Sequence, residues 1–239
     1  MIDEKPKRID PYPRSDERSF AYQVARTTLD AAASAVPGAG YALGELVKHY
    51  IGEPLEKRRE EWFARIGEGV IELQSRFEAF DPASLDQNEE FISVVYEATQ
   101  IAMKTSHEEK REALRNTILN TALGFVLDDV VRGSFMDYVD RFSPLHIKAL
   151  RLLQDPTKSH EMSRRVSNMM AGGLGALLEA AIPAEARGAP VQRVYSDLSS
   201  ASLVEGGGLN VMMSDTGLMQ KRTTAIGDDF LRFIGTPAA

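Results

Sequence analysis

Residues that could carry out chemistry are few in this chain, and their spacing matches no catalytic or metal-binding pattern. There are no cysteines, which excludes disulfides, thiolate metal ligands and cysteine nucleophiles. His160-Glu161 resembles the start of a zincin helix, but Arg164 stands where that helix carries its second histidine. The other histidines, His49, His107 and His146, do not recur at a ligand spacing either. We therefore predict no metal site.

Nucleophiles, paired acids and phosphate-binding loops are also missing from the pattern. No serine lies in a G-x-S-x-G elbow, and adjacent acids such as Asp228 and Asp229 diverge by about 100° on a helix instead of converging. The glycine-rich stretches 172–175 and 206–208 lack the preceding strand and the following Lys-Thr of a phosphate loop. We expect no catalytic residue, no bound cofactor and no enzymatic activity.

The elements that would position any site are mostly helices. Residues 1–17 are charged and proline-rich, so we expect a disordered arm there, with no apolar core of a signal peptide. Residues 18–142 show apolar side chains at helical spacing throughout and are predicted to form an α-helical domain. Within it, Asn88 is a predicted helix N-cap, because its side chain can accept a hydrogen bond from the first turn.

The last part of the chain, residues 143–239, reads as helix, helix, helix, hairpin, helix. Ser143-Pro144 opens the first helix, since proline suits a first helical turn. Three glycines at 206–208 precede a β-compatible run, which predicts a small hairpin between Leu209 and Arg222 and no strand before it. The predicted fold is therefore mainly α, with an N-terminal multi-helix domain and a winged-helix-like C-terminal domain with one small β-hairpin.

The apolar stripes also predict which side chains form the core. Each lies on an apolar face at helical spacing and should be mostly buried. These residues are Trp62, Ile66, Phe91, Val95, Ile118, Phe135 and Tyr138.

Charge argues against a nucleic-acid-binding function for the winged-helix-like part. The chain holds 28 Lys and Arg against 35 Asp and Glu, a net charge of −7, whereas phosphate-gripping domains are strongly basic. The predicted recognition helix, 191–204, offers few base-reading side chains, and the candidate nucleic-acid contacts are Arg193, Lys221 and Arg222. We do not expect sequence-specific duplex binding from so few cations.

Two further segments have alternative interpretations. Arg58, Arg59 and Trp62 are candidate interface residues, although the neighbouring acids offset much of their charge. The uncharged segment 31–44 contains a G-x-x-x-G spacing typical of membrane helix pairs, but it is shorter than the roughly 20 residues of a spanning helix. We expect a tightly packed soluble hairpin there and no integral membrane insertion.

Several stretches resemble a scattered group of uncharacterised, mainly α-helical bacterial proteins. They are AVPGAGYALGEL, EKRREEWFARIGEGVIEL, EEFISVVYEATQIAMKTSHEEKREALRNTILN, FSPLHIKALRLLQDP and TTAIGDDFLRFIG. A weaker similarity is to the alpha-type abortive-infection proteins of phage defence. The resemblance implies a bacterial protein with this helical architecture, and it provides no catalytic residue.

Three hypotheses about function follow. The first is a cytoplasmic, non-enzymatic protein-interaction module, which binds an unknown protein partner or itself, in a stress or phage-defence response. The second is a winged-helix transcription regulator that binds DNA. The third is a membrane-acting effector that uses the segment 31–44.

Overall fold

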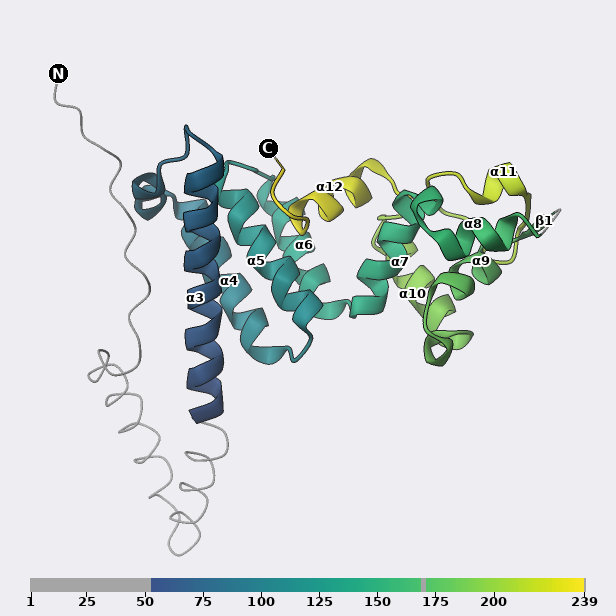
Figure 1. Cartoon of the computed structure of the whole chain (residues 1–239), viewed down its shortest axis with the longest axis horizontal. Helices are drawn as coiled ribbons and strands as arrows, with labels where there is room; N and C mark the ends of the chain where they lie inside the picture. Colours follow the sequence, from purple (N-terminus) through teal and green to yellow (C-terminus); the bar gives the residue numbers. More distant parts are fainter. Residues whose placement is uncertain (1–52, 169–170, 239) are drawn as a thin grey trace, which may run out of the picture. The chain divides into compact units, whose positions relative to one another are not determined.

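The structure is a computed structural model that describes residues 53–168 and 171–238. This part of the chain is mainly helical, as the sequence predicts (Figure 1). It also includes one small two-stranded sheet. The predicted arm at 1–17 and the segment 31–44 lie outside the described residues, as does His49.

The described residues fall into two compact units. Unit 1 holds residues 53–106, 118–124 and 237–238, and unit 2 holds residues 107–117 and 125–236 except 169–170. The domain boundary predicted between residues 142 and 143 stays a prediction.

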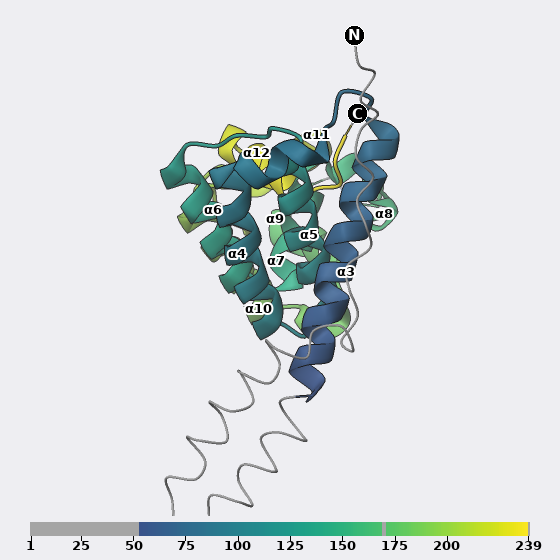
Figure 2. The same ribbon diagram turned by 90° about the vertical axis from the view of Figure 1, so that its left-hand side faces the viewer.

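Unit 1 is built on a pair of long helices. Its elements are α3 (Glu53–Arg76), the 3-10 helix η3 (Pro82–Gln87), α4 (Glu89–Lys104) and the last turn of α5 (Glu108–Ala122). α3 packs alongside α4 (Figure 2). The predicted N-cap is confirmed, because the Asn88 side chain accepts a hydrogen bond of 3.0 Å from the amide of Phe91 at the start of α4.

Unit 2 contains a longer series of short helices and the sheet. Besides the first turns of α5, its elements are α6 (Asp129–Arg141), α7 (Pro144–Gln154), η4 (Pro156–Lys158), α8 (His160–Val166), β1 (Ala171–Gly173), α9 (Leu174–Ala181), η5 (Ala184–Ala186), α10 (Ala189–Ser200), β2 (Met212–Ser214), α11 (Asp215–Leu218) and α12 (Ala225–Phe233). α7 begins at Pro144, so the predicted helix start there is confirmed.

The predicted hairpin between Leu209 and Arg222 is wrong, because the strands of the sheet come from different parts of unit 2. β2 pairs antiparallel with β1, so that Gly172 lies opposite Met213, and the chain after β2 forms the short helix α11. Gly173 permits the close approach of the segment before β2, since a Cβ there would lie 2.9 Å from the carbonyl oxygen of Leu209. A strand of glycines has no alternating pattern, which explains why the sequence did not indicate it.

The core prediction is confirmed for four of its residues. Trp62, Ile66, Ile118 and Phe135 are buried, whereas Phe91, Val95 and Tyr138 are only half-buried. On α4 the buried residues are Val94, Ala98, Ile101 and Ala102, and Phe91 and Val95 lie at the edge of this face. Small alanines are better suited than large side chains to the close contact between α3 and α4.

Aromatic rings form the centre of unit 2. The Phe135 ring lies 5.2 Å from Phe230 in an edge-to-face arrangement and 5.6 Å from Phe233. Such pairs contribute about 0.5–1.5 kcal/mol beyond the burial of their area. This cluster fastens α12 to α6 within unit 2.

Candidate binding groove

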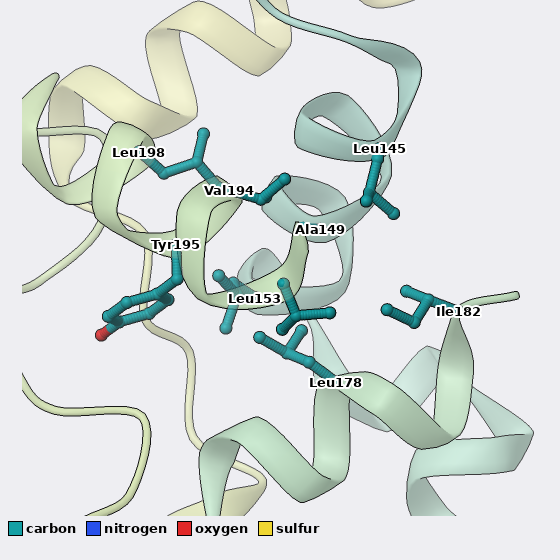
Figure 3. Close-up of a pocket in the computed structure, with 9 residues that line it drawn as sticks. Leu145, Ala149, Leu153, Leu178, Ile182, Val194, Tyr195 and Leu198 are labelled. Carbon is teal, nitrogen blue, oxygen red and sulfur yellow. The ribbon is translucent and has the colours of Figure 1, made fainter. Parts of the chain in front are cut away.

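α7, α9 and α10 meet in an apolar layer that contains a very small cavity. Figure 3 shows leucine, isoleucine and valine side chains from these helices pointing toward one another, with Tyr195 at one side. The space among them is only about 10 Å³, and no polar atom is exposed in it. A cavity of this size holds at most one water, and an apolar one stays dry. The layer is therefore part of the hydrophobic core and offers no ligand site.

A much larger open groove lies on the surface of unit 2, and Leu145 lines it as well. It measures about 1280 Å³, and both apolar and polar side chains line it. The first turns of α5 and the helix α7 line the groove, and the segment from α9 to η5 adds Ala181, Pro183 and Ala186. The segment between α7 and α8 also lines it, through Asp155, Lys158, Ser159 and Glu161. This concavity is large enough for a segment of another molecule.

α7 presents two cations to the groove. Lys148 and Arg151 are three residues apart, so they lie on the same face of the helix. Both side chains are exposed, and neither forms an ion pair or a hydrogen bond with another described residue. The apolar Leu145 and Leu152 line the groove beside them. The α7 wall therefore combines apolar contact area with unpaired positive charge.

The α5 wall is acidic, but most of its charge is neutralised within the helix. Glu108 accepts from the Arg111 guanidinium at 2.6 Å, and Glu112 lies 3.7 Å from Arg115. Glu109 alone among these acids has no ion-pair partner in the described part of the chain. Among side chains without an ion-pair partner in the described residues, α7 thus contributes two cations and α5 contributes one acid.

The three candidate nucleic-acid residues already have partners within unit 2. Arg193 donates to the Asp197 carboxylate at 2.9 Å, and Lys221 pairs with Asp228. Arg222 donates to the carbonyl oxygen of Gly217 at 2.7 Å, which fixes the loop around α11. A phosphate would have to compete with these contacts, and nucleic-acid contact through these three cations stays a prediction.

The exposed face of α10 is also poor in groups that read bases. Its exposed residues beyond the first turn are Gln192, Arg193, Ser196 and Ser200. Specific major-groove contacts come chiefly from Arg, Lys, Asn and Gln side chains. Gln192 and Arg193 are the only exposed groups of this kind on α10 beyond its first turn, and the Arg193 guanidinium already pairs with Asp197.

The candidate interface residues of unit 1 are not on one common surface. Trp62 is buried, and its indole Nε1 donates to Thr99 Oγ1 on α4 at 2.9 Å. Arg58 is half-buried and donates to the carbonyl oxygen of Met103 at 3.0 Å. Arg59 is exposed and stands over the Phe63 ring. Trp62 and Arg58 hold α3 to α4, and an interface at this place stays a prediction.

His146 connects the start of α7 with α10. Its Nδ1 accepts from the Ser143 amide at 3.1 Å and lies 2.8 Å from Ser143 Oγ, while Nε2 lies 3.4 Å from Asp197 Oδ2. The ring stacks on Phe142 at 4.7 Å. Burial lowers the pKa of His146, and the hydrogen bond and charge of Asp197 oppose that shift. Ser143, His146 and Asp197 thus lie next to one another. We interpret the contact between His146 Nδ1 and Ser143 as a helix capping box and not as a nucleophile–base pair.

Lys110 is another titratable group with an unusual environment. It is buried, which lowers its pKa, and its Nζ donates to the carbonyl oxygen of Asp140 at 2.6 Å. Lysine at a helix C-terminus satisfies the last carbonyl groups. We interpret Lys110 as the residue that fastens the end of α6 to α5.

The sequence did not single out the residues of the groove. Lys148 and Arg151 occupy the polar face of a helix that the sequence did predict, so their exposure could have been inferred. That they face α5 and η5 depends on packing between segments far apart in the chain. Ser143 and His146 are close in sequence, but Asp197 is 51 residues from His146.

Two negative findings concern the described residues alone. No three histidine, aspartate or glutamate side chains gather there as a set of metal ligands. None of the helices in residues 53–168 and 171–238 has both the length and the apolar composition needed to cross a bilayer.

Comparison of the chain with protein-family models, with curated proteins and with solved structures gave no match.

Proposed function

We propose that this protein is a non-enzymatic interaction module, and that unit 2 binds a helical segment of a partner protein in the groove. The observation that carries the proposal is the α7 wall, where two unpaired cations stand beside exposed apolar surface in a large concavity. Apolar contact with a few placed charges is the usual composition of a helix-binding groove.

The size of the groove fits a short helix. A helix of about ten residues is about 15 Å long and 10 Å wide, which corresponds to a volume of roughly 1200 Å³. The groove measures about 1280 Å³. The groove is therefore large enough to accept a segment of two to three turns, with its apolar face toward Leu145 and Leu152.

The two cations of α7 favour a partner segment that places acidic side chains along this wall. On α7, Lys148 and Arg151 have no ion-pair partner among the described residues. Of the acids that line the groove, Glu108 and Glu112 have arginine partners, whereas Glu109 and Glu161 have none in the described part of the chain. Opposite charges across an interface increase the association rate and set orientation. The partner segment we propose is an amphipathic helix with leucine-like residues on one face and glutamate or aspartate along the edge that meets α7.

A charge-reversal experiment tests this function. A synthetic amphipathic peptide of roughly four turns, with leucines on one face and glutamates along one edge, should bind the full chain. The double variant Lys148→Glu/Arg151→Glu should weaken that binding at least about tenfold, which is about 1.4 kcal/mol, because two attractions become repulsions. Fluorescence anisotropy of the labelled peptide measures the Kd.

The matched control is Arg164→Glu/Arg165→Glu, which makes the same change in charge at exposed positions of α8 that do not line the groove. We expect its Kd to stay within about twofold of the wild-type value, after allowance for long-range screening. Equal losses in both variants would mean that net charge alone attracts the peptide. Sedimentation of the chain without peptide shows whether a second copy occupies the groove instead.

The order of elements supports a winged-helix-like arrangement as the scaffold of this proposal. α8, β1, α9, α10 and β2 follow one another and β2 pairs with β1, although α11 follows β2 where a winged helix would have the second strand of its hairpin. Winged helices bind either DNA or protein, so this order alone does not decide between them.

The DNA-binding alternative makes an opposite prediction. If unit 2 binds a partner protein, replacing Arg193 and Lys221 with glutamine should leave any duplex binding nearly unchanged, since both side chains already pair with aspartates. Affinity for duplex should stay weaker than about 1 μM at physiological salt, the nonspecific range. Nanomolar binding to one promoter fragment in a mobility-shift assay, lost in the double variant, would favour a transcription regulator.

A further inference from the structure

The junction between α6, α7 and α10 contains a half-buried imidazole with all its polar contacts inside unit 2. The His146 side chain is 12% exposed, and its two nitrogens contact different elements. Nδ1 accepts the Ser143 amide at the start of α7, and Nε2 faces the Asp197 carboxylate of α10. Only a neutral imidazole with its hydrogen on Nε2 can make both contacts.

Protonation would place a hydrogen on Nδ1, directly opposite the Ser143 amide hydrogen. The Ser143 hydroxyl can rotate to accept from the new N–H, but the backbone amide cannot change its role. The first turn of α7 would then lose the acceptor that closes its capping box. Ser143 is half-buried, and an amide donor left there without an acceptor is destabilising.

The charged groups that face the ring do not reverse this effect. Asp197 favours the imidazolium, but its Oδ2 already accepts from Arg193 at 2.9 Å. Arg193 itself and Arg141, whose guanidinium stands over the Phe142 ring that stacks on His146, both disfavour a second positive charge. Together with burial, these two cations outweigh the single carboxylate, and the lowered pKa of His146 agrees with that balance.

We propose that His146 is a pH-sensitive joint, in which the neutral ring holds α7 to α10 and protonation releases the first turn of α7. Because the folded state lowers the pKa, stability is complete above about pH 6.5 and is lost as the pH falls below it. The first turn of α7 carries Pro144 and Leu145, which line the groove. Release would therefore alter the shape of the groove. The effect on partner binding rests on the proposed function, whereas the pH-sensitive joint does not depend on it.

NMR titration of the full chain tests the joint directly. The ring signals of His146 should titrate with a midpoint below about 6.5, the value of histidine in an unstructured peptide. In Asp197→Asn the midpoint should move further down, because the one group that favours the charged ring is lost. Protection of the Ser143 amide against hydrogen exchange should fall at least tenfold as the ring becomes charged. A midpoint at or above 6.5, or a Ser143 amide indifferent to protonation, contradicts the proposal.

His146→Gln gives a second readout that depends on folding alone. Glutamine at this position can close the capping box but does not titrate. Between about pH 7 and pH 5, its ratio of folded to unfolded protein should fall less than that of wild type. The difference approaches a factor of about ten for each unit by which folding lowers the pKa of His146. An equal fall in both proteins would overturn the proposal. If the variant does not fold, the NMR titration of His146 in the wild-type chain still tests it.

Discussion

Replacing Gly227 with alanine is expected to disrupt the packing of α12 and destabilise unit 2 by more than about 3 kcal/mol, the upper end of typical overpacking costs. Gly227 lies in the first turn of α12, where a Cβ would come 2.0 Å from the carbonyl oxygen of Leu203 and 2.9 Å from its carbonyl carbon. These are backbone atoms, so no side-chain rotation can relieve the clash. Urea unfolding followed by circular dichroism measures the loss.

Gly133 is the matched control for this substitution. It lies within α6, and a Cβ there meets no atom within 4 Å. Gly133→Ala should therefore stabilise the protein by about 0.5–1 kcal/mol, through helix propensity and the reduced entropy of the unfolded chain. If Gly227→Ala unfolded at the same denaturant concentration as wild type, the close approach of α12 to Leu203 would be wrong.

Replacing Phe135 with alanine is the second large effect. Phe135 is 1% exposed, and its ring contacts Phe230 and Phe233, so the substitution removes the centre of the aromatic cluster. A cost of about 3–5 kcal/mol is expected for a fully packed phenylalanine, because lost burial and a residual cavity add together.

An exposed valine near Phe135 provides the comparison. Val130 is 77% exposed in the first turn of α6, and Val130→Ala should change stability by no more than about 0.5 kcal/mol. A midpoint for Phe135→Ala as close to wild type as that of Val130→Ala would place the Phe135 ring at the surface. Loss of the near-ultraviolet circular dichroism signal would confirm that the aromatic cluster is affected.

The helices and their starts could be predicted because their signals are local. Asn88 reaches only three residues to cap α4, and Pro144 fits its own first turn. The sheet could not be predicted in the same way. β1 is a run of alanine and glycines without β propensity, and β2 stabilises it from a distant part of unit 2.

The candidate site was less predictable than the fold for the same reason. A helical projection of α7 places Lys148 and Arg151 on its exposed face, but only the folded chain shows that α5 and η5 complete a groove there. In the opposite sense, Arg193 and Lys221 look like free cations in the sequence. Their partners Asp197 and Asp228 follow within a few residues, and helix geometry together with the turn into α12 brings each pair together.

The most direct test of the groove proposal is to map where the acidic amphipathic peptide binds the full, isotope-labelled chain. In an NMR titration, we expect the largest amide shift changes at Leu145, Lys148 and Leu152 on α7 and at the residues of α9 and η5 that line the groove. A peptide with lysines in place of the glutamates should produce much smaller changes at the same concentration. Shift changes that leave α7 unaffected, or that are equal for both peptides, would contradict the proposal that unit 2 binds an acidic helix in this groove.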